Sequence, residues 1–383
     1  MPDRARRARW SVTAFFALNG CLYATFYSRF PAIQDRTGAS DGELGLALLC
    51  AMLGLLVAQP FAGALVSRLG SRPVMYAGAL VYALGLVPVA IAEGLGQLAG
   101  AMVVIGMGSG LLDVSMNVHG LTVEGRLGRP ILSGLHAAYS FGALGGAAVG
   151  GLLAAAGVGV VPHLGAVAAA GAALVFGTGR LLLPPGADAV PEGPMLAVPT
   201  RGLVLVGLFA LCVLLSEGAV SDWSAIYIND DVGAAEGTAA GGLAAFSLTM
   251  AIGRLAGDRL NERLGALSLA RAGATLAALG IGTALVADGP GSAIAGFGLT
   301  GLGLSALFPL ALRAAAAQGR SAGTAVAAVS AMGYVGFLAG PPAIGGLAEL
   351  FSLRGALLLP VALCVLAAAL ARRVRAPAVA RSR

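Results

Sequence analysis

The chain has 383 residues, of which 58% are hydrophobic and only 11% are charged, whereas roughly a quarter of the residues in a soluble globular domain are charged. This composition excludes an ordinary soluble domain and indicates a protein that crosses a membrane many times. The net charge of +6 gives no sign of nucleic-acid binding, because the arginines gather at the ends of apolar segments. The four cysteines lie singly inside apolar segments, so we expect neither a disulfide framework nor a metal site.

Apolar runs of about the 20 residues that a hydrocarbon core requires recur along the whole chain. They predict twelve membrane-spanning helices and therefore an all-α membrane protein. The expected spans, in chain order, are about 10–30, 43–66, 73–93, 97–121, 132–156, 161–183, 202–228, 238–257, 265–287, 291–316, 322–347 and 354–371.

Arginine is distributed unevenly over the connections between these spans. It precedes the first span, follows the last and occupies every second connection, for example at Arg68 and Arg72 after the second span. The other connections carry mainly acidic residues, such as Asp41 and Asp230. Because arginine-rich loops stay in the cytoplasm, we expect both chain termini to be cytoplasmic.

A polar segment rich in proline and glycine lies at 184–201, near the midpoint of the chain. We expect it to be a cytoplasmic linker, flexible or extended, between two bundles of six helices that comprise residues 1–183 and 202–383.

The two bundles are related in sequence. The motif that begins at Gly63 recurs 190 positions later at Gly253, and the Gly-x-Gly at 106–108 recurs at the same offset at 296–298. Parallel repeats of this kind are typical of transporters that work by rocking one bundle against the other around a site between them.

The connection after the second span reads Gly63-Ala-Leu-Val-Ser67-Arg68-Leu-Gly70-Ser71-Arg72. It resembles the signature of the major facilitator superfamily between its second and third helices, which normally has aspartate at Ser67 and a basic residue at Ser71. In the second half of the chain, Asp258 and Arg259 supply the acidic and basic pair. The residues that this resemblance assigns to conformational change are Gly63, Arg68, Gly70, Arg72, Asp258 and Arg259.

Four stretches, at 113–117, 123–124, 128–137 and 216–224, narrow the resemblance to the MosC/YbjJ-like branch of bacterial transporters. The resemblance implies the superfamily fold of two pseudo-symmetric six-helix bundles in a bacterial cytoplasmic membrane. It also implies that the first and fourth helices of each bundle line a central path. We expect a monomer whose partners are a small-molecule substrate, protons and the lipid bilayer, without nucleic acid.

The fourth span carries the most informative polar residues. Asp113 and Asn117 are four residues apart, so a helix places them on one face. Ionisable residues inside membrane spans usually have a functional role. We therefore expect Asp113 to take part in ion coupling or in substrate binding. The alternative is that Asp113 forms a structural hydrogen bond between helices. Asn117 either joins the fourth and fifth spans or belongs to the path. His136 either titrates or stays neutral and donates to Asn117 or to a carbonyl group. Glu124 is expected in an ion-pair cluster with arginines of the cytoplasmic loop.

The seventh span supplies a second set of candidates, Glu217 and Asp222, and the first span supplies Asn19 and Tyr23. Trp223 lies near the outer end of the seventh span. It belongs either to the aromatic belt at the membrane interface or to a stacking platform for a ring-shaped substrate.

These observations predict a secondary active transporter of a small organic solute, either sugar-like or polyol-like or a metabolite or drug. It would work by alternating access and be coupled to protons. The alternative is a non-transporting solute sensor with a transporter fold. No Walker, HExxH or serine–histidine signature is present, so we expect no enzyme activity and no cofactor. We expect the solute and ion pathway to be formed by Asp113, Asn117, His136, Glu217, Asp222, Asn19, Tyr23 and Trp223.

Overall fold

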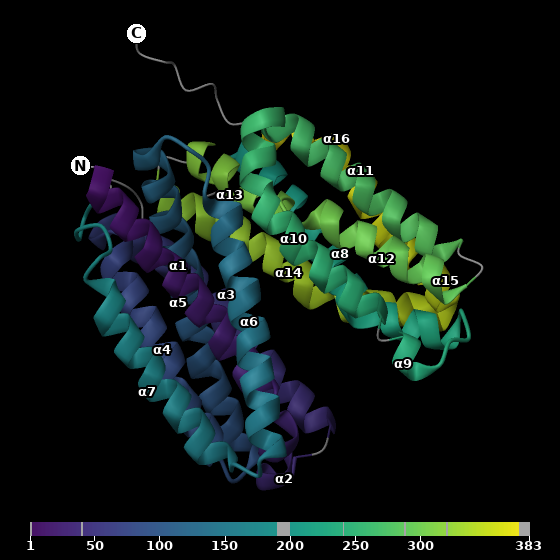
Figure 1. The fold of residues 1–383 in the computed structure, drawn as a ribbon, viewed down its shortest axis with the longest axis horizontal. Coiled ribbons are helices and arrows are strands. Elements are labelled where there is room, and N and C mark those ends of the chain that lie inside the picture. The colour runs from purple at the N-terminus through teal and green to yellow at the C-terminus, as the bar shows by residue number, and fades with distance from the viewer. Residues whose placement is uncertain are drawn as a thin grey trace. The chain divides into compact units, whose positions relative to one another are not determined.

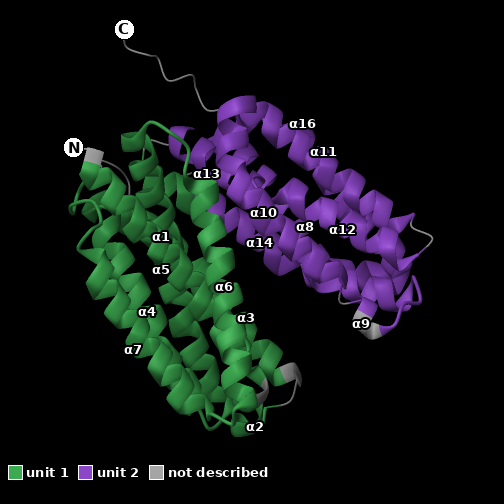
Figure 2. Ribbon diagram, viewed as in Figure 1, with its two compact units in different colours: residues 1–198, 320–327 green, residues 199–319, 328–383 purple. Residues whose placement is uncertain are grey.

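The computed structural model describes residues 2–39, 41–189, 200–239, 241–286, 289–318 and 321–374. Within these ranges every regular element is a helix (Figure 1), which confirms the predicted all-α class. The chain divides into two compact units (Figure 2). Unit 1 comprises Met1–Val198 and Arg320–Ala327, and unit 2 comprises Pro199–Gly319 and Ala328–Arg383.

Unit 1 holds the helices of the first part of the chain. The central helix, α5, packs extensively along both α3 and α4, while α1 packs along α6 and α4 packs along α7. The helices are α1 (Pro2–Tyr27), α2 (Phe30–Thr37), α3 (Asp41–Leu69), α4 (Ser71–Ile91), α5 (Leu95–Leu127), α6 (Leu132–Ala155) and α7 (Val160–Gly179).

Glycines allow α3 and α5 to approach closely. A Cβ atom at Gly106 would overlap the carbonyl oxygen of Ala51, and a Cβ atom at Gly110 would overlap that of Leu55. Small residues permit such backbone contact between membrane helices. Both pairs differ by 55 in residue number, so the two helices run in the same direction, and each α5 residue lies level with the α3 residue numbered 55 lower.

In the second part of the chain, α12 packs along α10 and α11, and α16 packs along α8 and α11. The elements are α8 (Arg201–Asp230), α9 (Glu236–Ala239), α10 (Gly241–Leu264), α11 (Ala266–Leu285), α12 (Pro290–Leu304), α13 (Leu307–Gln318), α14 (Ala322–Leu350), α15 (Leu353–Ala356), α16 (Leu358–Leu370) and η1 (Ala371–Val374).

Ten helical segments of the described ranges are long and apolar enough to cross a membrane. They correspond to ten of the twelve predicted spans. The other two, at 10–30 and 238–257, correspond to α1 and α10, which have 26 and 24 residues but carry several charged side chains. The predicted span at 291–316 contains a break, because α12 ends at Leu304 and α13 begins at Leu307.

The first part of the predicted linker is fixed to unit 1. Residues Pro185–Asp188 form a turn, and the Asp188 carboxylate accepts hydrogen bonds from the backbone N–H of Ser71 at 2.8 Å and from its Oγ at 2.5 Å. Thr122 Oγ1 on α5 lies 3.3 Å from the same carboxylate. Asp188 therefore satisfies an otherwise open N–H group at the start of α4. Residues 190–199 of the linker lie outside the described part of the chain.

A buried histidine supports the same junction. His119 Nε2 accepts the N–H of Leu183 at 3.2 Å, so the proton of the neutral ring lies on Nδ1, which is 2.7 Å from Ser71 Oγ. His119 then donates to Ser71, whose hydroxyl donates to Asp188. Gly70, the N-cap residue of α4, has a φ of 80°, and a Cβ atom at this position would lie 2.7 Å from the backbone nitrogen of Gly186. These contacts hold residues 183–188 against the ends of α4 and α5.

Candidate functional site

A chain of three polar side chains lies inside unit 1, between α5 and α6. Asn117 Nδ2 is 2.8 Å from the backbone oxygen of Asp113 and 3.2 Å from its carboxylate Oδ1. On the other side, Asn117 Oδ1 is 3.1 Å from His136 Nε2. All three residues are buried, with 4%, 0% and 8% of their surface exposed for Asp113, Asn117 and His136. The i and i+4 spacing predicted from the sequence places Asp113 and Asn117 on one face, as expected.

The geometry fixes the orientation of the amide and the tautomer of the imidazole. A backbone carbonyl only accepts, so the Asn117 nitrogen is the donor to Asp113, and Asn117 Oδ1 must accept from His136. His136 therefore carries hydrogen on Nε2. A second proton on His136 Nδ1 would charge the ring without disturbing the bond to Asn117. Of the two readings of Asn117, the bridge between α5 and α6 is present in the structure.

The first helix closes the cluster from one side. Asn19 is 6% exposed, and its Nδ2 lies 3.8 Å from the sulfur of Met116 on α5. The Phe16 ring meets the His136 ring edge-on, with 5.2 Å between the centroids. Four of the predicted pathway residues, Asp113, Asn117, His136 and Asn19, thus gather where α1, α5 and α6 meet. We call this group the α5 polar cluster.

The polar cluster has two groups that can hold a proton, the Asp113 carboxyl and the His136 imidazole. Both groups are buried away from water, and an unbalanced charge is costly in such an environment. Binding of a proton makes the carboxyl group neutral and removes this cost. The Asn117 amide between them orients both groups by hydrogen bonds. The cluster therefore links the carboxyl group of α5 to the imidazole group of α6 through one amide.

Glu124 lies at the connection between α5 and α6. Its Oε2 accepts the backbone N–H of Ile131 at 2.7 Å and that of Leu132 at 3.1 Å. The carboxylate therefore caps the N-terminus of α6, where N–H groups lack partners within the helix. The residue fixes the connection between α5 and α6.

In unit 2, Glu217 on α8 forms an ion pair with Arg254 on α10, with 3.2 Å between Oε1 and Nη2. The two side chains are 18% and 13% exposed. Ser221 shares the face of Glu217, and its hydroxyl donates to the Glu217 backbone oxygen. Arg254 is not among the pathway residues expected from the sequence. Its position inside the predicted span at 238–257 was the available signal, because arginine in a span is rare and usually paired.

The other candidates on α8 lie apart from this pair. Asp222 is exposed, and Trp223 is partly buried beside Gly345 of α14. The indole nitrogen of Trp223 has no hydrogen-bond partner within the described part of the chain.

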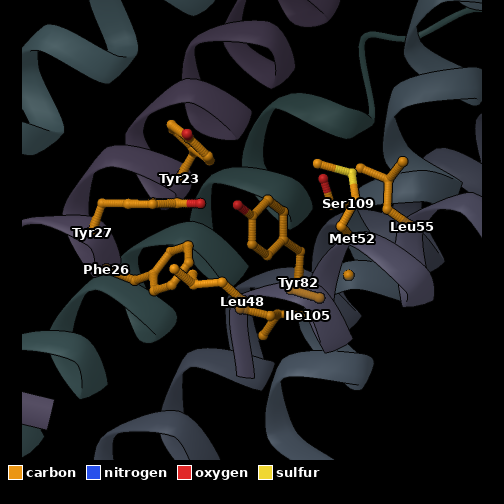
Figure 3. Close-up of a pocket in the computed structure, with 11 residues that line it drawn as sticks. Tyr23, Phe26, Tyr27, Leu48, Met52, Leu55, Tyr82, Ile105 and Ser109 are labelled. Atoms are coloured by element: carbon orange, nitrogen blue, oxygen red, sulfur yellow. The ribbon is translucent and has the colours of Figure 1, made fainter. Parts of the chain in front are cut away.

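Tyr23 belongs to an aromatic group at the end of α1. Its ring centroid lies 4.4 Å from that of Tyr27, which in turn lies 4.5 Å from that of Phe26 and 4.6 Å from that of Phe30 on α2. Tyr23, Phe26 and Tyr27 line one side of a pocket with a volume of about 80 Å³ (Figure 3). The pocket lies wholly within unit 1.

The first loop motif spans the end of α3 and the start of α4. Gly63 is buried and Arg68 is exposed, while the guanidinium carbon of Arg72 lies 5.8 Å from the centre of the Tyr76 ring. Ser71, which replaces the basic residue of the superfamily signature, binds His119 and Asp188 instead.

In the second motif, Asp258 forms its ion pair with Arg313 of α13 at 2.7 Å, and the neighbouring Arg259 is exposed. Sequence adjacency did not indicate this partner. No group of three or more possible metal ligands occurs among the described residues.

Comparison with known proteins places these features in a family. The family model of the Major Facilitator Superfamily matches residues 12–218 and 206–383. An uncharacterised transporter of this type from Yersinia pestis is 34% identical over 364 residues, which are 94% of each chain. An uncharacterised transporter of Sinorhizobium fredii is 36% identical over 348 residues, 90% of this chain and 92% of the other. Membrane protein MosC of Rhizobium meliloti is 30% identical over 367 residues, 92% of this chain and 86% of that protein.

Solved structures share the fold at low identity. The fucose:proton symporter FucP of E. coli has a TM-score of 0.79 at 18% identity, covering 95% of this chain and 97% of that one. The human organic anion transporter MFSD10 has a TM-score of 0.78 at 14% identity, covering 96% and 99%. The predicted superfamily and its MosC-like branch are thereby confirmed. This chain belongs to the Major Facilitator Superfamily and is a membrane transporter rather than an enzyme.

Proposed function

We propose that the protein is a proton-coupled secondary transporter of a small organic solute in a bacterial cytoplasmic membrane. The observation that carries this proposal is the buried α5 polar cluster, in which Asp113 and His136 are joined through Asn117. Residues 1–183 and 202–371 rock about the solute path, and both termini lie in the cytoplasm. The protein works as a monomer, and Asp113 is the main proton carrier.

Burial is the physical reason for choosing Asp113. Insertion scales give a cost of about 2.5–3.5 kcal/mol for an aspartate at the centre of a membrane helix. Proton uptake removes the charge and hence most of this cost, whereas an approaching cation or water favours the charged form. A carboxyl that meets these two environments in alternation gains and loses a proton once per cycle.

The ion pair in unit 2 complements this role. Glu217 and Arg254 balance each other's charge within α8 and α10. We assign Glu217 to the solute path and Asp113 to the proton. Asp222, Trp223 and Asn19 complete the path in this proposal. The similarity in fold to a fucose:proton symporter supports both proton coupling and a sugar-like or polyol-like solute.

Flux in proteoliposomes tests the proposal. Purified full-length protein is reconstituted, and uptake of labelled L-fucose and myo-inositol is followed with an imposed pH gradient of either direction. We expect gradient-driven uptake that a protonophore abolishes. Asp113→Asn should lose this component while inserting normally, and Asp230→Asn, at the exposed end of α8, should retain it.

Two outcomes would contradict the proposal in different ways. Gradient-driven uptake by Asp113→Asn equal to that of the unaltered protein would remove Asp113 from coupling. Binding of a solute without uptake in either gradient would favour the sensor over the transporter.

A further inference from the structure

The pocket described above has walls from four helices of unit 1. Tyr23 and Tyr27 come from α1, Tyr82 from α4 and Ser109 from α5, while α3 contributes apolar side chains such as Met52. Figure 3 shows the hydroxyl groups of Tyr27 and Tyr82 pointing toward one another across it. We call it the tyrosine pocket.

We propose that the tyrosine pocket binds the ring of an uncharged, hydroxylated solute, either a cyclic polyol or a single sugar unit, beside the α5 polar cluster. This inference rests on the proposed function, because it names the class of solute that the transporter carries and one place where it binds.

The polar atoms of the pocket favour an uncharged ligand. The polar side chains that line it carry hydroxyl groups, and none of its lining side chains is charged. A charged solute would therefore leave its hydration shell without gaining an opposite charge. A hydroxyl group both donates and accepts, and tyrosine hydroxyls therefore match the hydroxyl groups of a polyol.

The aromatic wall favours a ring over an open chain. Tyr27 packs against Tyr23, Phe26 and Phe30, with ring centroids 4.4 to 4.6 Å apart. Rings held in mutual contact lose little further freedom when a ligand arrives, which lowers the entropic cost of binding. Their flat, apolar faces suit the C–H face of a saturated ring, and their hydroxyl edges suit its substituents.

The size of the pocket limits the ligand. Its volume of about 80 Å³ lies well below the roughly 300–1,000 Å³ of sites for drug-sized molecules. The small volume therefore favours a single ring over a disaccharide or a multi-ring drug.

The position of the pocket connects it with Asp113. Ser109 precedes Asp113 by four residues on α5, so it lies on the same face about one helical turn, or roughly 6 Å, away. On α3, too, a polar residue lies one helical turn from the pocket, because Gln59 follows the lining residue Leu55 by four positions. The α3–α5 register places Gln59 level with the residue after Asp113.

Gln59 adds an independent observation. It is fully buried, and neither its amide nitrogen nor its amide oxygen has a hydrogen-bond partner in the part of the chain that the structure describes. A buried carboxamide that lacks partners is costly, and a hydroxylated ligand reaching inward from the pocket would satisfy it. Gln59 is not among the residues that line the pocket, and we place it at the inner end of the proposed site because it lies one helical turn from the lining residue Leu55.

Binding to the purified full-length protein in detergent tests this inference without any flux. Isothermal titration calorimetry is carried out with myo-inositol, L-fucose and D-glucose as hydroxylated rings, with mannitol as an open-chain polyol and with glucuronate as a charged ring. We expect at least one neutral ring to bind, and mannitol and glucuronate to bind at least about tenfold more weakly or not at all.

Substitutions locate the site. Tyr27→Phe and Tyr82→Phe should each weaken ring binding by about three- to tenfold, the usual effect of one lost hydrogen bond. Tyr76→Phe is the matched control, because Tyr76 lies on the same helix as Tyr82 but outside the pocket. Gln59→Leu should weaken ring binding by a similar factor. Tyr27 is more exposed than Tyr82, so Tyr27→Phe still tests the site if Tyr82→Phe fails to fold.

The outcomes separate this inference from the proposed function. No binding of any neutral ring, binding of glucuronate alone, or ring binding unchanged in all three variants would overturn the tyrosine pocket as the site. Proton-driven uptake could persist in each of these cases. Conversely, ring binding that depends on Tyr27 and Tyr82, without uptake in proteoliposomes, would support the pocket and contradict transport.

Discussion

His136 Nε2 on α6 and Asn117 Oδ1 on α5 lie 3.1 Å apart, and this hydrogen bond crosses between two groups of helices in unit 1. On one side, α5 packs mainly with α3 and α4; on the other, α6 packs mainly with α1. Direct packing between α5 and α6 is sparse by comparison. The bond therefore adds a buried polar connection where direct packing between α5 and α6 is sparse.

Replacing Asn117 tests this connection. Asn117→Leu keeps the volume but removes the acceptor for His136 and the donor to Asp113, so we expect a loss of about 1–3 kcal/mol of stability. The unfolding of purified protein in detergent gives the change. In a double-mutant cycle with His136→Phe, the coupling energy should be about 0.6–1.7 kcal/mol, the range for hydrogen bonds between membrane helices. Additive effects of the two changes would show that the bond contributes no stability.

The ion pair between Glu217 and Arg254 leads to a second prediction. Arg254→Met leaves the Glu217 carboxylate largely buried without its counter-charge, and loss of one partner of a buried pair costs about 3–5 kcal/mol. The double variant Glu217→Gln with Arg254→Met should be more stable than the single variant, because no lone charge remains.

The pair of Arg36 with Glu93 provides the control for this comparison. Its side chains are 36% and 76% exposed, and exposed pairs contribute about 0–1 kcal/mol. Arg36→Met should therefore leave the melting temperature nearly unchanged. A melting temperature for Arg254→Met equal to that of Arg36→Met would contradict a stabilising role for the pair in unit 2.

The contrast between Asn117 and Arg254 shows what a sequence can predict. A helix brings residues four apart onto one face, so local spacing was sufficient to group Asp113 with Asn117. The depth of His136 in the predicted fifth span placed it level with Asn117, which made Asn117 one of its possible partners. Arg254 pairs with a residue 37 positions away, and Asp188 binds Ser71 across 117 positions. Contacts of that kind depend on how helices pack, and periodicity carries no information about them. The predicted linker at 184–201 illustrates the same limit, because its composition gave no indication of the turn that Asp188 fixes.

Asp188 is the subject of the third prediction. Asp188→Ala removes three hydrogen bonds, among them the one to the first N–H of α4, so the start of α4 should fray. We expect faster hydrogen exchange of the amides from Ser71 to Met75 and a loss of about 1 kcal/mol, similar to that of a removed N-cap. Asp230→Ala, which alters an exposed residue near the end of α8, should leave exchange in α4 unchanged. Equal protection of α4 in both variants would show that the Asp188 contact is dispensable.

The register of α3 against α5 gives the fourth prediction. Gly106 faces the Ala51 carbonyl so closely that a methyl group at 106 must push the helices apart, whereas a Cβ atom at Gly100, on the same helix, meets no atom within 4 Å. Overpacking of a tight interface costs about 1–3 kcal/mol. Gly100→Ala should be neutral or slightly stabilising, because alanine is the better helix former. Gly106 also lines the tyrosine pocket, so Gly106→Ala should lower both the melting temperature and the affinity for a neutral ring. Thermal unfolding with and without ligand measures both effects in one experiment. If Gly106→Ala and Gly100→Ala behave alike, then close contact between α3 and α5 neither limits stability nor shapes the pocket.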